Sequence, residues 1–122
     1  MPKDSRVYLE DILASLGKIE QYTKGLTQTL FEKDQMVVDA VTKNLEVIGE
    51  AVKRLPADLK KANPEIEWRK VAGLRDILIH EYAGVDLRIV WDVVTNKLPT
   101  VKLVVRQMLK KSDAHYATTA RN

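Results

Sequence analysis

The sequence predicts an all-α protein, a helical bundle of four to five main helices running up and down. Apolar residues recur at steps of three and four along most of the chain, which is the period of an amphipathic helix. Residues suited to capping helices precede these apolar stretches, and glycine or proline separates them. With 122 residues, 45% of them apolar and 30% charged, the chain fits one globular domain.

Two long helices are expected in the first half of the chain. Asp4 or Ser5 can cap the first, which carries an apolar stripe as far as Tyr22 and stops at Gly25. Thr27 is placed to cap a short turn, and Asp34 to cap the second long helix. That helix has an apolar stripe over five turns, formed by Val37, Val41, Leu45, Ile48, Val52 and Leu55.

Proline and glycine divide the second half. Asn63-Pro64 breaks the chain before a helix that runs from about Ile66 and ends at Gly84. Asp86 is placed to cap a further helix, and Pro99 is expected to interrupt the chain before a last one. The β-branched residues of these two segments are spaced by three and four rather than two, which favours helix over strand.

Composition limits the function classes. We expect one domain over residues 1–111 and a frayed polar tail over 112–122. The absence of cysteine excludes disulfides, thiolate zinc sites and cysteine nucleophiles. No apolar run approaches the roughly 18 residues of a membrane span, and no apolar signal core follows the N-terminus, so we expect a cytoplasmic protein. A net charge of +3 permits nucleic-acid binding but does not indicate it.

Four chemically active side chains fall within eight residues: Arg75, Asp76, His80 and Tyr82. Asp76 and His80 are four apart and share one face of a helix, whereas Arg75 and His80 lie about 140° apart around its axis. Arg75 and His80 could still meet in one of three ways. The helix could be distorted, the long side chains could curl round, or two copies could face each other across a two-fold axis. Spacing alone favours a structural histidine and a solvated Arg–Asp pair.

The pattern Arg75-x4-His80-x-Tyr82 resembles the Arg-x4-His-x-Tyr motif of the HepT-like toxins in the HEPN superfamily. The similarity extends from about residue 5 to residue 111, and four flanking segments carry it in the family's order: Asn44–Ala51, Trp68–Asp76, Val90-Trp91 and Leu98-Pro99.

This resemblance implies a homodimer that cleaves RNA without a metal or other cofactor. Both protomers would contribute Arg75 and His80 to a cleft at the interface. A histidine can move protons near neutral pH, and an arginine fork suits the phosphate oxygens. Asp76, one turn before His80, would support the imidazole. The expected products carry a 2′,3′-cyclic phosphate and a free 5′-hydroxyl.

Tyr82 has a separate expected role. In the family that this chain resembles, a partner MntA-like nucleotidyltransferase antitoxin attaches AMP to the tyrosine of the motif. At Tyr82 the added charge and bulk would lie beside Arg75 and cover the RNA cleft. The alternative is a tyrosine that stacks on a base or packs locally.

Other functions remain open from the residues alone. The first is a non-catalytic binding or regulatory subunit of a nucleotidyltransferase. A phosphorelay histidine is disfavoured because Ala83 stands where such domains usually have lysine. A metal hydrolase is disfavoured because His80 has no second histidine three or four residues away.

Several nearby residues have simpler interpretations. Gly49 in the second long helix is expected to permit the close approach of another helix. Glu50 either bonds across a dimer interface or is a solvated carboxylate. Trp68 and Trp91 are expected in the core. Scattered basic residues could form a rim for phosphates or only a solvated face: Lys53, Arg54, Lys60, Lys61, Arg69 and Lys70.

Overall fold

Long helices that alternate in direction build the protein, as the apolar periodicity predicts. The computed structural model describes residues 3–80 and 84–121, with side chains over 5–78 and 84–112. No strand occurs within these residues, so the all-α fold class is confirmed. The elements in chain order are α1 (Lys3–Thr23), α2 (Gln28–Lys33), α3 (Gln35–Arg54), α4 (Ala57–Lys61), α5 (Trp68–His80), α6 (Leu87–Asp92), the π-helical η2 (Val93–Lys97) and α7 (Leu98–Arg121).

The expected helix boundaries are set by local chemistry. Gly25 has a φ of +78°, which only glycine adopts without strain, and it follows the end of α1. The Thr27 hydroxyl and the Asp34 carboxylate each accept a hydrogen bond from the backbone N–H three residues ahead, both at 3.2 Å. The Asp86 carboxylate accepts from the backbone N–H of Arg88 at 2.9 Å. These three predicted caps are confirmed. The cap expected at Asp4 or Ser5 is wrong, because both residues lie inside α1, which already includes Lys3.

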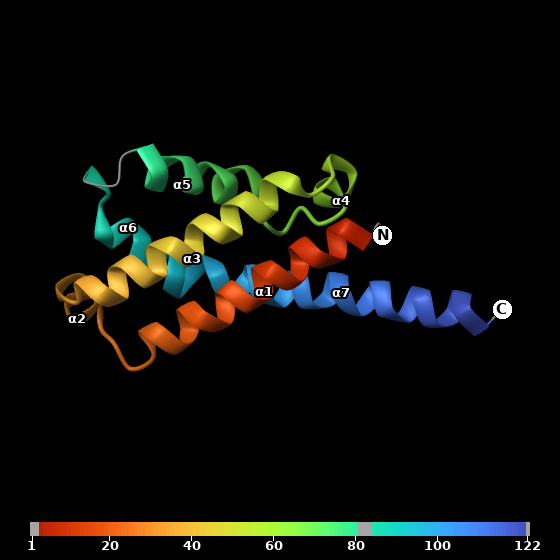
Figure 1. Cartoon of the computed structure of the whole chain (residues 1–122), viewed down its shortest axis with the longest axis horizontal. Coiled ribbons are helices and arrows are strands. Elements are labelled where there is room, and N and C mark those ends of the chain that lie inside the picture. Colours follow the sequence, from red (N-terminus) through yellow and green to blue (C-terminus); the bar gives the residue numbers. More distant parts are fainter. Residues whose placement is uncertain (1–2, 81–83, 122) are drawn as a thin grey trace.

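The helix α3 is the centre of the bundle. It packs against α1 on one side and α5 on the other, and α1 also packs against α7 (Figure 1). Its apolar stripe is buried from Val41 onward, with Val41, Ile48 and Val52 fully so, and each fully buried side chain stabilises the fold by roughly 1.5–3 kcal/mol. Because α3 is fixed by contacts on both sides, it is a rigid support for residues on its remaining surface.

The prediction of a break at Pro99 is wrong. The helix continues without interruption from α6 through η2 into α7. In an α-helix the proline ring would clash with the carbonyl four residues earlier, that of Thr95. The wider π turn accommodates it: the N–H of Leu98 donates to the carbonyl of Val93, five residues back. A π-helical insertion therefore replaces the break.

The limits of two further helices can be compared with expectation. The helix α5 begins at Trp68, two residues after the expected start at about Ile66, and Gly84, expected to end the helix, lies outside it. The backbone of α7 remains helical to Arg121, through the segment expected to fray, and extends beyond the rest of the bundle (Figure 1). No glycine or proline occurs after Pro99 to stop the helix. The domain limits and the frayed tail stay predictions.

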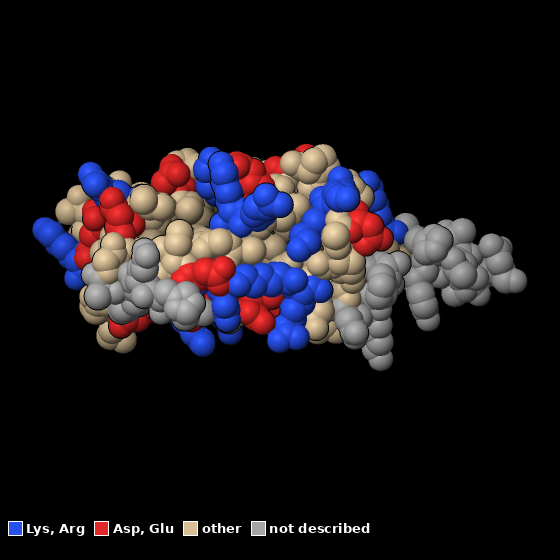
Figure 2. Space-filling view, turned by 90° about the horizontal axis from the view of Figure 1, so that it is seen from above, with Lys and Arg blue, Asp and Glu red and all other residues tan. Residues whose placement is uncertain are grey.

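The surface carries mixed charge. Figure 2 shows basic and acidic side chains interspersed on the viewed face, without one continuous basic patch, in keeping with the small net charge of +3. None of the helices in the described ranges has the length and hydropathy to span a bilayer. Both tryptophans pack as expected: Trp68 is buried, and the Trp91 ring lies 5.2 Å from that of Phe31.

Candidate functional site

A close contact between α3 and α5 fixes the position of Arg75. A Cβ added at Gly49 on α3 would lie 2.2 Å from the Cβ of Arg75 and 3.3 Å from the carbonyl oxygen of Val71. No side chain fits in that space, so only glycine lets the two helices approach this closely. The predicted role of Gly49 is confirmed, and the residue that it faces is the motif arginine itself.

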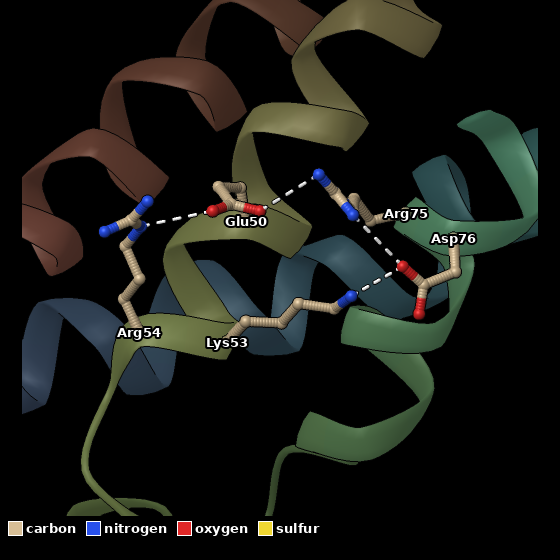
Figure 3. A network of polar contacts seen from close by, with 5 residues as sticks. All are labelled: Glu50, Lys53, Arg54, Arg75 and Asp76. Carbon is tan, nitrogen blue, oxygen red and sulfur yellow. Dashed lines mark hydrogen bonds and ion pairs between the residues drawn. The ribbon is translucent and has the colours of Figure 1, made fainter.

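The Arg75 guanidinium lies between two carboxylates (Figure 3). Its Nη2 is 3.2 Å from Oε2 of Glu50 on α3, and its Nη1 is 3.2 Å from Oδ1 of Asp76 on α5. The arginine side chain is 28% exposed. A guanidinium held at both terminal nitrogens has a defined direction, while its exposed part can still meet a ligand.

Two more cations complete the cluster, which we call the polar network: Glu50, Lys53, Arg54, Arg75 and Asp76. Nε of Arg54 lies 3.1 Å from Oε1 of Glu50, and Nζ of Lys53 lies 2.5 Å from Oδ1 of Asp76 (Figure 3). Cations and carboxylates alternate along it, three against two. The network is thus locally positive by one charge.

These contacts keep the network ionised. The hydrogen bond from Lys53, and then that from Arg75, hold the pKa of the Asp76 carboxyl below its usual value. Hydrogen bonds to Tyr8 and Glu50 raise the pKa of the Arg54 guanidinium. Because these groups are solvent-accessible, their ion pairs contribute little to stability. Their effect is on charge and orientation at neutral pH.

The polar network suits an anion better than a cation. Each of its carboxylates already contacts two basic side chains. Across the described part of the chain, no group of three histidine or acidic side chains is placed to hold a metal ion. A phosphate, by contrast, matches a locally positive cluster with a pre-oriented guanidinium.

The other motif residues lie at the edge of what the structure describes. His80 is the last residue of α5, and only its backbone is described. Tyr82 lies outside the described residues. The backbone is α-helical from Arg75 to His80, so α5 does not distort between them. The structure brings Arg75 and Asp76 together; the expected support of His80 by Asp76 stays a prediction.

Two hollows flank the helix α3, and Arg75, a motif residue whose side chain the structure describes, lines the smaller one. The larger, about 550 Å³, is mainly apolar and lies between α5 and the η2–α7 segment. Of the motif residues with described side chains, neither Arg75 nor Asp76 lines it. The smaller, about 360 Å³, lies between α1 and α3 and is lined in part by Arg75, Glu50 and Arg54. The Arg75 guanidinium therefore faces the smaller hollow, which we call the α1–α3 groove.

Sequence reasoning missed the role of Glu50. Neither expected alternative, a bond across an interface or a solvated carboxylate, includes its ion pair with Arg75 within one chain. The contact joins residues 25 positions apart, and helix periodicity carries no information on such pairs. The neighbouring Gly49 is the available signal, because a glycine inside a helix indicates where a partner helix comes close.

Comparison with known proteins adds a family assignment to this geometry. The profile of the family described as "Ribonuclease HepT-like" matches residues 12–108. This range includes the whole polar network and the motif from Arg75 to Tyr82. No solved structure matches the chain with significant similarity.

Curated relatives are similar over most of this chain. "Probable ribonuclease HepT" of Thermococcus cleftensis is 42% identical over 84% of this chain and 93% of its own length. "Putative RNase MJ0127" of Methanocaldococcus jannaschii is 43% identical over 90% of this chain and 92% of its own. A third, "Gamma-glutamylcyclotransferase and putative RNase MJ0434" of the same organism, is 40% identical over 93% of this chain, which spans about half (51%) of that relative.

Proposed function

Because the chain belongs to the HepT-like ribonuclease family, we propose that it is a metal-independent endoribonuclease and the toxin of a cytoplasmic toxin–antitoxin pair. The observation that carries the proposal is the fixed guanidinium of Arg75, held by Glu50 and Asp76 with part of it open to solvent. The names of this chain's relatives as ribonucleases favour RNA as the substrate whose phosphate Arg75 would contact.

The proposed reaction is an internal transfer at phosphorus. One His80 takes the proton of the ribose 2′-hydroxyl, whose oxygen then attacks the phosphorus. Arg75 neutralises the extra negative charge on the non-bridging oxygens. A second His80 gives a proton to the departing 5′-oxygen. The products are a 2′,3′-cyclic phosphate and a free 5′-hydroxyl, so the atoms balance without a metal-bound water.

A homodimer would supply the second histidine. In one protomer Arg75 and His80 lie about 140° apart around α5, and the helix is undistorted between them. A two-fold axis beside α5 places the same residues of two copies opposite each other. Mass measurement in solution tests this directly: a monomer that cleaves RNA at full rate contradicts the shared cleft.

The antitoxin part of the proposal concerns Tyr82. We propose that a partner nucleotidyltransferase transfers AMP from ATP to the Tyr82 hydroxyl and releases pyrophosphate. The new phosphodiester would bring negative charge near Arg75 and block RNA. Intact-mass analysis after incubation with the partner and ATP should show added AMP units. If Tyr82→Phe still gains AMP, the modified residue is not Tyr82.

The nuclease proposal is tested by the ends of its products. Purified protein, freed of contaminating nuclease, is incubated with labelled single-stranded RNA in excess EDTA. We expect fragments with 2′,3′-cyclic phosphate ends from the wild type and none from His80→Ala. Equal cutting by His80→Ala would overturn the proposal, and intact RNA with the wild type would favour the non-catalytic subunit.

A further inference from the structure

The α1–α3 groove extends away from Arg75 along the bundle surface. Tyr8 and Asp11 of α1 line one wall, and Lys43, Glu46 and Arg54 of α3 line the other. Lys43 and Arg54 are eleven residues apart on α3, about 16 Å along the helix. A volume of about 360 Å³ falls within the range of small-molecule sites, roughly 300–1,000 Å³.

The aromatic wall of this groove is pre-oriented. Tyr8 packs against the edge of the core, only partly buried, and it lines the groove together with Arg54 of the polar network. A tyrosine ring held by packing against the core is a platform on which an unstacked nucleobase can lie. Arg54 lines the same groove and is linked through Glu50 to the guanidinium of Arg75.

The polar lining also selects among bases. Within the described part of the chain, neither Asp11 nor Glu46 takes part in an ion pair, so both carboxylates are available as acceptors. Carboxylates accept hydrogen bonds from the exocyclic amino groups of cytosine, adenine and guanine. Uracil has no such amino group; its one free donor on that edge, N3–H, lies between two carbonyl oxygens, which repel a carboxylate.

The geometry points to a nucleotide subsite: the α1–α3 groove holds the base next to the phosphate that contacts Arg75. Tyr8 provides the stacking surface, Glu46 and Asp11 accept from the base, and Lys43 neutralises a phosphate further along the strand. The subsite prefers adenine, cytosine or guanine to uracil. The inference rests on the proposed function for RNA as the ligand.

Binding is measured without cleavage by using 2′-O-methyl oligonucleotides, which have no 2′-hydroxyl to attack phosphorus. The probes are fluorescein-labelled hexamers of A, C and U, followed by anisotropy at one fixed salt concentration. We expect the wild type to bind the A and C hexamers about tenfold more tightly than the U hexamer. Glu46→Ala should remove this preference, whereas Glu65→Ala, an exposed carboxylate in the other hollow, should retain it.

Tyr8 gives a second measurement. Tyr8→Ala should weaken binding of all three hexamers by about tenfold or more, while Tyr8→Phe, which keeps the ring, should bind nearly as the wild type does. If circular dichroism shows that Tyr8→Ala is unfolded, the comparison of Glu46→Ala with Glu65→Ala still tests the subsite.

Two results would overturn the subsite. One is wild-type binding without a base preference; the other is a preference that survives in Glu46→Ala or is lost equally in Glu65→Ala. Failure of the nuclease proposal has a different signature, since unmodified RNA would then stay intact while the hexamers still show the preference that Glu46→Ala removes.

Discussion

Gly49 and Arg75 are matched across the contact between α3 and α5. The space of 2.2 Å between the Cβ of Arg75 and the position of a Cβ on Gly49 leaves no room for any other residue there. The ion pair of Arg75 depends on this close contact, because Glu50, the next residue along α3, lies within reach of the Arg75 guanidinium. The long central helix therefore both positions the motif arginine and supplies its ionic partner.

Gly49→Ala should disrupt this contact. The new methyl group meets Arg75 and the backbone of Val71, and overpacking of this kind costs about 1–3 kcal/mol. Chemical denaturation should show that loss, together with reduced RNA cleavage. Gly73→Ala on α5 is the matched control, since nothing lies within 4 Å of its added Cβ. It should stabilise the protein by about 0.5–1 kcal/mol, and a similar loss in both variants would contradict the account.

Glu50→Gln should strengthen the binding of RNA and slow its cleavage. The amide keeps the shape of the side chain but removes a negative charge beside the proposed phosphate position, so KM for RNA should fall. Arg75 is then held less firmly, and kcat should fall about fivefold, as a loss of about 1 kcal/mol produces. Steady-state kinetics on one RNA substrate measures both. Kinetics unchanged from those of the control Glu65→Gln would exclude Glu50 as a positioning residue.

Lys53→Met should raise the pKa of Asp76 toward its usual value, about 3.9. Lys53 is the main cause that lowers it. A carboxyl with a lowered pKa in the folded state stabilises the protein above its unfolded pKa, and this contribution is lost as the pH falls through the folded value. The stability difference between wild type and Lys53→Met, which is small because the pair is solvent-accessible, should therefore be present at neutral pH and vanish in acid.

Carbon NMR of the Asp76 carboxyl against pH measures this shift. The control is Lys70→Met, because Lys70 pairs with Glu67 and lowers the pKa of that carboxyl instead. It should leave the Asp76 titration unchanged. An Asp76 midpoint that stays low in Lys53→Met would mean that Arg75 alone sets it.

The fold was largely predictable because it rests on local rules. Apolar spacing located the long helices, and the side chains of Thr27, Asp34 and Asp86 identified helix starts that the structure confirms. Pro99 was misread for a physical reason: proline rules describe α-helices, and the π turn before it removes the clash on which the prediction depends.

The site was predictable only in part. Arg75 and Asp76 were identified by their spacing and by family resemblance, but the partner of Arg75 was not. Glu50 lies on another helix, and which carboxylate reaches the guanidinium depends on how α3 and α5 cross. The same holds for Lys53, which was expected only as part of a diffuse basic rim and instead bonds to Asp76.

The most direct test of the central claim is the single-turnover rate of RNA cleavage by Arg75→Ala in EDTA, with and without added guanidinium chloride at low millimolar concentration. If the guanidinium of Arg75 stabilises charge on the phosphate, the variant should lose at least about a hundredfold in rate, and the free guanidinium ion should restore part of it. Cleavage by Arg75→Ala at the wild-type rate would contradict the account.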